Sequence, residues 1–451
     1  MNIDFSIYED LGINTKSKTF KRFLNAGLLD KIDEDYIKDV KFYWKENYGK
    51  EIDPVLHLAF YNLTGKKDLR VVPMPEMWNE ILPYFNDMDI RVGYSDKNIY
   101  DRLISPTNTP DTILKRVRGL YFNHKNDILT KNEAAETLKQ YNEFIIKPSN
   151  TDNGKGVSKV YQKDNLLLIK GQIITFEELE EKFNENFIVQ EVIEQHPIMA
   201  EPHPDSVNSL RMVTFRWKNE IKYLLTFARF GAHGEIKDNA GTGGVCVGVN
   251  QKGEFLDVAV DEHANTYTHH PSTGFKFSEM KAIPNFDDFK SYVIDLHKNV
   301  LHHDLISWDI AVDVNGAPVF IEANYRGATW LYQMAIQDSF FGDLTEEVLN
   351  HIKEIKSSSS LLTIRNSNSD YGKLKQKHKK LKNRNKELLM EVKEYKRKNK
   401  RVRKKLKKLK AYKEELELVN QSLLKDKQAI INSKSWRYTQ VLRKLRKKLP
   451  K

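Results

Sequence analysis

The sequence is poor in cysteine and contains no long apolar run. Cys246 is the only cysteine among 451 residues, which excludes a disulfide framework and any metal site built from several cysteines. No stretch approaches the roughly 18 consecutive apolar residues that a membrane-spanning helix needs. The acidic N-terminus lacks the apolar segment of a secretory signal. These absences favour a reducing compartment, so the sequence predicts a cytoplasmic protein.

Charge is divided unevenly along the chain. Residues 357–451 contain 32 Lys and Arg residues against 8 Asp and Glu, a net charge of +24. Subtracting these from the totals of 73 and 62 leaves 41 basic and 54 acidic residues in the first 356, a net charge of −13. The sequence therefore predicts an acidic globular body and a basic tail that meets an anionic surface, either a membrane or nucleic acid.

The spacing of apolar residues divides the chain into regions. Helical spacing predicts a helical region over residues 1–88, and short apolar segments between helices predict an α+β domain over residues 89–356. Tight turns such as Val314-Asn315-Gly316 imply antiparallel pairing. The expected strands are Glu143–Lys147, Val157–Tyr161, Phe187–Val192, Leu210–Trp217, Tyr223–Phe230, Val245–Val249, Ile306–Val314 and Pro318–Ala323. The expected helices of this domain are Phe176–Phe183 and Phe286–His303.

A polar linker over residues 357–370 leads to a long heptad pattern over residues 371–432. One position of the heptad is apolar from Leu374 to Ile430, whereas the second seam holds only three apolar residues and several Asn. Asn at such positions favours two parallel strands, so the pattern predicts a weak homodimeric coiled coil. The alternative is a single solvated charged helix.

The last residues, 433–451, form a separate basic segment. Trp436 and three leucines recur at helical spacing, and Arg and Lys occupy most other positions. This pattern is typical of an amphipathic helix on an anionic membrane surface, here the inner face of the cell membrane. The alternative is a solvated helix end without a partner. Nucleic acid is not favoured as a partner, because no recognition fold is visible.

A strand that ends in Lys147 is followed by a small polar loop that contains Gly154, Lys155 and Gly156. Backbone N–H groups of such a loop can approach phosphate oxygens closely, because glycine has no Cβ. The loop lacks the spacing of a Walker motif and precedes a strand instead of a helix. An ordinary hairpin turn is therefore the alternative interpretation.

Two further strands present Asp309, Glu322 and Asn324. Glu322 and Asn324 share one face of their strand because they are two residues apart. Carboxylate and amide oxygens suit Mg²⁺, which often carries nucleotide phosphates. The alternative is that each side chain only caps the end of a strand.

Together these elements resemble the ATP-grasp superfamily over about Val92 to Asn350. The order is a strand-final lysine, a Gly-containing loop, a Gln-Glu-Val hinge and a D-x₁₂-E-x-N pattern, whose spacing is similar to that of D-alanine–D-alanine ligases. Further stretches look like the sugar-transfer-associated ATP-grasp family, which is linked to bacterial cell-surface polysaccharide synthesis. These stretches are Asp96–Asn98, Asn208–Arg211, Asp238–Gly244 and His270–Gly274. The resemblance implies an α+β ATP-grasp fold with an N-terminal helical region and a C-terminal long helix or coiled coil.

The resemblance also implies roles for the residues that bind ATP. Lys97 and Lys147 look like the two lysines that hold the α- and β-phosphates, although Lys97 stands in a polar stretch where a surface lysine is an equal interpretation. The hinge residues are expected to contact adenine, and a following glutamate to accept from the ribose hydroxyls. These residues are Gln190, Glu191, Val192 and Glu194.

The remaining roles concern catalysis. Asp309, Glu322 and Asn324 would bind two Mg²⁺ ions, and Arg211 looks like the cation that stabilises charge on the transferring phosphoryl group. The function expected is an ATP-dependent ligase that activates a carboxylate as an acylphosphate for attack by an amine. Its substrate would be a small molecule or a sugar-linked precursor. The alternatives are a kinase that stops at phosphoryl transfer and a non-catalytic scaffold that holds glycosyltransferases.

Overall fold

A computed structural model describes residues 5–151, 156–164, 166–234, 236, 238, 241, 243–357 and 370–446. Contacts divide the chain into two compact units, Met1–Ser357 and Ser358–Lys451. The first unit combines helices with β-sheets, and the second is helical in its described residues. The predicted α+β fold with a helical N-terminal region and a long C-terminal helix is confirmed.

The chain begins with a helical region, as its apolar spacing predicts. Ser17 caps one helix by accepting from Phe20 N, and Asp33 caps the next by accepting from Tyr36 N. The described helices are α1 (Ser6–Asp10), α2 (Lys18–Asn25), α3 (Glu34–Tyr48), α4 (Val55–Thr64), α5 (Met74–Glu76), the π-helix η1 (Met77–Ile81), α6 (Leu82–Phe85), α7 (Arg91–Tyr94), the 3-10 helix η2 (Lys97–Ile99) and α8 (Tyr100–Leu103).

The first sheet has the strand order β3-β2-β1-β8-β4-β5-β6-β7. Its strands are β1 (Thr112–Val117), β2 (Leu120–Phe122), β3 (Ile128–Leu129), β4 (Glu143–Pro148), β5 (Ser158–Lys163), β6 (Leu166–Ile169), β7 (Gln172–Ile174) and β8 (Phe187–Gln190). Helices α9 (Lys131–Leu138) and α10 (Phe176–Phe183) begin at Thr130 and Thr175, each with a reciprocal capping box. Their apolar faces pack on this sheet around Phe144 and Phe187.

The second sheet has the order β13-β12-β11-β10-β9-β14-β15. Its strands are β9 (Ser209–Trp217), β10 (Glu220–Phe230), β11 (Val245–Val249), β12 (Phe255–Val260), β13 (Thr266–Tyr267), β14 (Leu305–Val312) and β15 (Pro318–Asn324). The short helices α11 (Pro197–Ala200), η4 (Phe277–Glu279) and η5 (Gly342–Leu344) lie in the connections, and α12 (Phe286–Lys298), α13 (Thr329–Ile336) and α14 (Thr345–Ser357) are longer. The paired strands of both sheets are antiparallel, as predicted. The turn between β14 and β15 needs Gly316, whose φ is +81°.

Two differences from the sequence prediction have physical causes. The sequence analysis does not predict β1, β2, β3, β6, β7, β12 and β13. Of these, β3, β7 and β13 are short strands at the sheet edges and carry little apolar pattern. The helix predicted over Phe286–His303 ends at Lys298 instead. Arg216 of β9 donates to the carbonyls of His297 and Val300, so a side chain from the sheet satisfies the last helical carbonyls.

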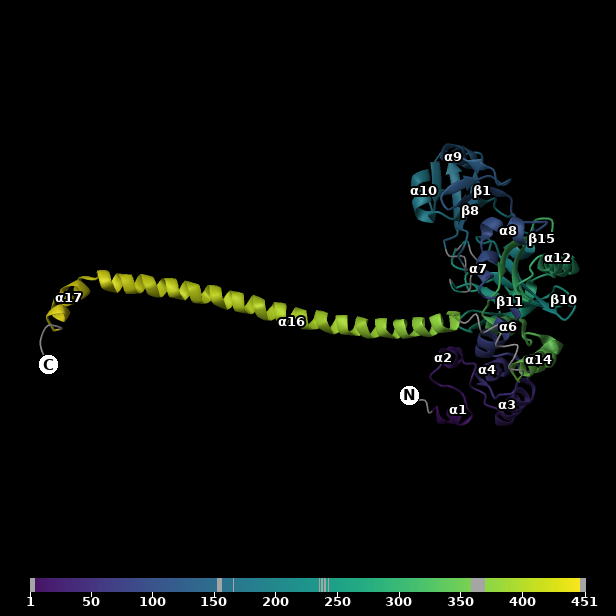
Figure 1. Ribbon diagram of the computed structural model, residues 1–451, viewed down its shortest axis with the longest axis horizontal. Coiled ribbons are helices and arrows are strands. Elements are labelled where there is room, and N and C mark those ends of the chain that lie inside the picture. The colour runs from purple at the N-terminus through teal and green to yellow at the C-terminus, as the bar shows by residue number, and fades with distance from the viewer. Residues whose placement is uncertain are drawn as a thin grey trace. The chain divides into compact units, whose positions relative to one another are not determined.

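One apolar core joins the N-terminal helices to the second sheet. Phe23 packs edge-on against Trp330 of α13, and Phe227 of β10 packs against Tyr332. Figure 1 shows α3, α4 and α14 together at one end of the Met1–Ser357 unit and α9 and α10 at the other. The helical region therefore covers one face of the second sheet, while α12 packs on the other.

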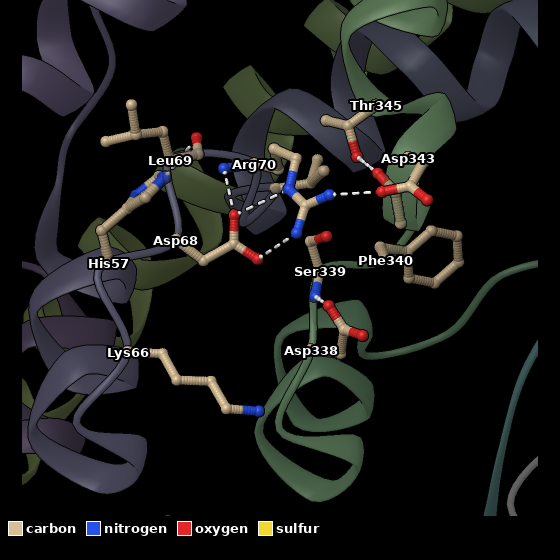
Figure 2. Close-up of polar contacts among 12 residues, drawn as sticks. His57, Lys66, Asp68, Leu69, Arg70, Asp338, Ser339, Phe340, Asp343 and Thr345 are labelled. Carbon is tan, nitrogen blue, oxygen red and sulfur yellow. Dashed lines mark hydrogen bonds and ion pairs between the residues drawn. The ribbon is translucent and has the colours of Figure 1, made fainter. Parts of the chain in front are cut away.

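Polar contacts also join the N-terminal region to α13 and η5. Arg70 follows α4 and donates from Nη1 to Asp343 Oδ1 of η5 at 2.8 Å, while Asp68 accepts from its Nε (Figure 2). Gln333 of α13 exchanges hydrogen bonds with both backbone groups of Val72. These contacts fix α13, the helix that carries Tyr332, against the N-terminal region.

The second unit contains the long helix α16 (Asp370–Asn432) and the short helix α17 (Lys434–Arg446). Its heptad side chains are exposed, from 41% for Leu388 to 68% for Tyr395. Ser433 separates the two helices and accepts from Trp436 N, and the Arg443 guanidinium lies 3.8 Å from the Trp436 ring centroid. Among the described residues, no helix combines the length and apolarity required to cross a membrane.

Candidate functional site

A cavity receives side chains from both sheets and from η2. The residues that line it and that the sequence singled out are Lys97, Lys147, Gln190, Glu191, Arg211, Asp309, Glu322 and Asn324. Its apolar walls include Ile145, Val157, Ile193, Val207, Ile236 and Ile321. Segments that lie more than 200 residues apart in the sequence thus meet in one place.

The register of the second sheet brings the acidic residues together. Asp309 of β14 lies opposite Glu322 of β15, and Arg211 of β9 lies opposite Asp309. Directly opposed residues of antiparallel strands point to the same face, so these side chains share a surface. Asn324 joins them, with Nδ2 at 3.3 Å from Asp309 Oδ2.

Asp309 is a buried carboxylate held by two arginines. Arg211 contacts it through both Nε and Nη2, the latter at 2.9 Å from Oδ2, and Arg229 Nη1 lies 3.0 Å from the same oxygen. Burial alone would raise the pKa of Asp309, but the charges of Arg211 and Arg229 outweigh it and hold the pKa below its usual range. The pKa values of both arginines are raised despite their burial, so the cluster is ionised.

Lys97 is not a surface lysine: its side chain is 5% exposed, so that interpretation is wrong. Its Nζ lies 2.9 Å from Glu322 Oε1 and donates to the carbonyl of Thr151. The backbone N–H of Lys97 donates to the Ser149 carbonyl at 2.8 Å. Lys97 therefore links Glu322 to the loop that follows β4.

Lys147 also lines the cavity, near the end of β4. Burial, and next the nearby charge of Lys97, lower the pKa of Lys147 to about 8. The buried hydroxyl of Ser149 has no hydrogen-bond partner among the described residues. In the described part of the chain Lys147 forms no ion pair, and a buried lysine of this kind is suited to an incoming anionic ligand.

The glycine loop is described only in part. Gly154 and Lys155, both expected to contact phosphate, lie outside the described residues. Gly156 is described and does not line the cavity. Its φ is +83°, and a Cβ there would stand 2.8 Å from Pro148 Cγ, so the loop needs glycine at this position for its own conformation.

The hinge is held by the first sheet. Gln190 donates from Nε2 to the Pro110 carbonyl at 3.2 Å, and Glu191 N donates to the Asp111 carbonyl at 3.0 Å. Val192 and Glu194 are not among the cavity-lining residues, whereas the intervening Ile193 is. Every second residue from Glu191 to Ile193 therefore faces the cavity, as an extended chain requires.

The sequence comparison now decides the family. Residues 79–350, more than half of the chain, match the family described as sugar-transfer associated ATP-grasp. The chain belongs to this family. The resemblance drawn from the motifs is confirmed.

Solved structures similar to this ATP-grasp chain have low sequence identity to it. The D-alanine–D-alanine ligase of Bacillus anthracis is 15% identical, with 58% of this chain and 69% of that one covered and a TM-score of 0.33. The L-amino acid ligase of Bacillus licheniformis is 13% identical over 57% of this chain, with a TM-score of 0.32. The chain spans about half of that ligase, 48%. Identities and scores this low say nothing about a shared substrate. No curated protein matches the chain.

The cavity contains residues that the motifs did not reveal. Arg229 and Asp238 line the cavity, and Arg229 Nη2 lies 3.1 Å from Asp238 Oδ1. Tyr332 of α13 accepts from Arg211 Nη1 at 2.8 Å. Asp238 begins one of the stretches that resemble the family, and Arg229 is a charge inside an apolar strand. That second signal, a buried charge needing a partner, was available in the sequence.

The residues fit a hard metal ion. Among the described residues, no group of three or more His, Cys, Asp or Glu side chains is placed to hold one. The candidate set is two carboxylates and an amide, Asp309, Glu322 and Asn324, and such oxygen donors are the ligands that Mg²⁺ prefers. Both carboxylates form ion pairs with lysine or arginine side chains in this structure. A metal ion that bound them would have to displace those side chains.

Proposed function

We propose that the chain is an ATP-dependent ligase that activates a substrate carboxylate as an acylphosphate. The observation that carries this proposal is the single cavity in which Lys97, Lys147 and Arg211 lie beside Asp309 and Glu322. Phosphoryl transfer needs positioning and positive charge more than covalent help from the protein, and these residues supply both.

Each wall of the cavity has a role in this proposal. Lys97 and Lys147 bind the α- and β-phosphates, while the apolar wall around Ile145 and the backbone of Gln190 and Glu191 hold the adenine. Asp309, Glu322 and Asn324 would hold Mg²⁺, which supplies positive charge to the phosphates.

The reaction has two steps. A carboxylate oxygen of the substrate attacks the γ-phosphorus, the bond from that phosphorus to the bridging oxygen breaks, and ADP leaves. Arg211, which Tyr332 of α13 holds in place, stabilises the negative charge on the transferring phosphoryl group. An amine or another nucleophile then attacks the acyl carbon, phosphate leaves, and the nucleophile loses its proton.

The substrate class follows from the family rather than from the cavity. The association of this family with sugar transfer supports a sugar-linked, amino-acid or polysaccharide precursor in bacterial cell-surface polysaccharide synthesis. Function argued from a family name is an analogy, so the substrate needs a direct screen.

The deciding experiment is a screen for ADP and phosphate release in the presence of Mg²⁺, with amino acids and sugar-nucleotide acids as substrates. Release of phosphate that requires a second, amine substrate supports the ligase. Release of ADP with a stable phosphorylated product, whatever amine is added, identifies a kinase. Failure to bind ATP would leave the non-catalytic scaffold, a hypothesis that the buried, ionised cluster around Asp309 does not favour.

We further propose that two copies pair through α16. The heptad leucines form an exposed seam, and a long helix with one apolar stripe gains stability by burying it against a second copy. Leu416 lies on the seam, whereas Leu418, two residues on, lies off it, although both are exposed. Light scattering on the full chain should therefore give an average mass closer to that of the monomer for Leu416→Glu. Leu418→Glu should leave the average mass unchanged. A monomeric wild-type chain would refute the pairing.

The end of the chain is proposed to bind an anionic membrane. Helix α17 presents Arg443 stacked on Trp436, an interfacial aromatic residue beside a cation. Such a short helix buries little apolar area, so binding should need anionic lipid and should be released by salt. Sedimentation with anionic vesicles but not with neutral ones supports this anchor. Equal sedimentation with both would refute it.

A further inference from the structure

The carboxylates of the proposed metal site are already paired with cations of the protein. Asp309 accepts from Arg211 and Arg229, and Glu322 accepts from Lys97. These pairs lie at a buried site, where an unpaired charge is costly. A metal ion that takes the carboxylates therefore leaves these cations in need of another anion.

The charges of the cavity balance. Four cations, Lys97, Lys147, Arg211 and Arg229, lie with four carboxylates, Glu191, Asp238, Asp309 and Glu322. A metal ion alone adds uncompensated positive charge to this site. A nucleotide alone brings phosphates toward carboxylates that repel them. The two ligands together satisfy both sets of charges.

Arg229 differs from Arg211 in having a second carboxylate partner, whereas the second partner of Arg211 is the Tyr332 hydroxyl. Its Nη1 lies 3.0 Å from Asp309 Oδ2, and its Nη2 lies 3.1 Å from Asp238 Oδ1. Asp238 is itself fixed to β9, because its Oδ2 accepts from Ser209 N at 3.0 Å and from the Ser209 hydroxyl. When Nη1 leaves Asp309, Asp238 still holds the other end of the guanidinium at the cavity wall.

We propose that Arg229, positioned by Asp238, is a second phosphate-binding cation of this site. Together with Arg211 it exchanges Asp309 for nucleotide phosphate when a divalent metal binds. Metal and nucleotide therefore bind cooperatively, each increasing the affinity of the other by the same factor. This inference rests on the proposed function, since it needs a nucleotide in the cavity.

The exchange predicts that Arg229→Gln changes the affinity for metal alone and the affinity for nucleotide in opposite directions. The variant loses a cation that competes with the metal, so the affinity for Mn²⁺ alone should increase, about fivefold. It also loses a cation for phosphate, so the affinity for ADP in the presence of Mg²⁺ should decrease, about tenfold. A variant that merely loosened the fold would weaken both. Calorimetry of Mn²⁺ alone, of ADP in EDTA and of ADP with Mg²⁺ measures these affinities without turnover.

Two further variants and one control sharpen the test. Arg229→Lys keeps the charge and should restore part of the ADP affinity while metal binding stays weak. Asp238→Asn should weaken ADP binding several-fold and leave the affinity for metal alone unchanged. The control is Arg216→Gln, which removes an ion pair to Asp304 on the same sheet outside the cavity and should change neither affinity.

Two results would overturn the inference. One is an Arg229→Gln protein whose two affinities both match those of Arg216→Gln. The other is wild-type protein that binds ADP equally well with Mg²⁺ and with EDTA. Wild-type protein that binds neither ATP nor ADP under any condition would instead overturn the proposed function itself. If Arg229→Gln fails to fold, Arg229→Lys and Asp238→Asn decide the question.

Discussion

The two units of the chain use positive charge in opposite ways. In Met1–Ser357, whose net charge is negative, the cavity holds buried cations such as Lys97, whose side chain is 5% exposed. In the described helices of Ser358–Lys451 the cations are exposed, and even a paired lysine such as Lys413 is 77% exposed. The largest excess of positive charge in the sequence therefore marks the tail, whereas the proposed chemistry depends on a few cations within an acidic unit.

The difference has an energetic meaning. Exposed ion pairs such as Lys413–Glu417 contribute little, on the order of 0–1 kcal/mol, so the tail can exchange its partners freely. Removing one partner of a buried pair such as Arg211–Asp309 leaves an uncompensated charge, so the pair can separate only when ligands supply replacement charges. Substitutions in the cavity should therefore change ATP binding and turnover, whereas changes in the tail should alter only membrane binding.

The largest effect is expected from Glu322→Gln. The substitution keeps the shape of the side chain but removes a hard anionic ligand, whose loss costs several kcal/mol in the transition state. Turnover should fall more than about 100-fold with the fold intact. Asp304→Asn, which breaks an ion pair to Arg216 outside the cavity, is the matched control and should retain activity. Full activity of Glu322→Gln at saturating Mg²⁺ would remove this residue from the site.

A smaller effect is expected from Lys147→Ala. Loss of a charged hydrogen bond to phosphate should weaken ATP binding by roughly 1.5–3 kcal/mol, or about 10- to 150-fold, measured by calorimetry. Lys159 on the neighbouring strand pairs with Glu143 and does not line the cavity, so Lys159→Ala should bind ATP normally. Equal affinities for the two variants would mean that Lys147 is structural.

The pH dependence of ATP binding should reveal the same lysine. With a pKa of about 8, Lys147 is charged at about pH 7 and mostly neutral at about pH 9 in the ligand-free protein. Only the charged form attracts phosphate, so ATP affinity should fall as pH rises through 8, by about tenfold by pH 9. Lys147→Arg keeps its charge over this range and should show no such fall. A pH profile shared by both proteins would contradict the assignment.

The smallest effect on chemistry is expected from deleting residues 433–451. The deletion should abolish sedimentation with anionic vesicles but change the ATP affinity by less than about twofold, because the cavity lies wholly within the other compact unit. Weaker ATP binding by the shortened protein would contradict the claim that the tail takes no part in nucleotide binding.

Sequence patterns predicted the parts of the site that lie close together along the chain. The D-x₁₂-E-x-N spacing names Asp309, Glu322 and Asn324, because adjacent strands joined by a tight turn bring such residues together. Arg229 and Asp238 pair with each other, but spacing could not place them in the site. Their other partners, Asp309 and Ser209, lie 80 and 29 residues away and meet them only through the fold. A motif can predict residues that lie at a fixed spacing along the chain, but ion pairs between distant residues depend on the whole fold.

The fold followed the same rule. Strands with continuous apolar runs, such as Val245–Val249, were predicted with correct bounds, because burial on both faces leaves a plain pattern. Short edge strands carry too few residues for a pattern. The end of α12 depends on Arg216, a residue about 80 positions earlier, so no local signal marks it.

The shared core between the N-terminal helices and the second sheet has an evolutionary consequence. Phe23, Trp330 and Phe227 belong to one apolar cluster, so helices α1 to α4 cannot be gained or lost as an independent module. A relative without them would expose the aromatic face of β9 and β10 and the helix that presents Tyr332 to Arg211. Any such relative must have acquired another cover for that face, and the position of the arginine would then depend on whatever replaced it.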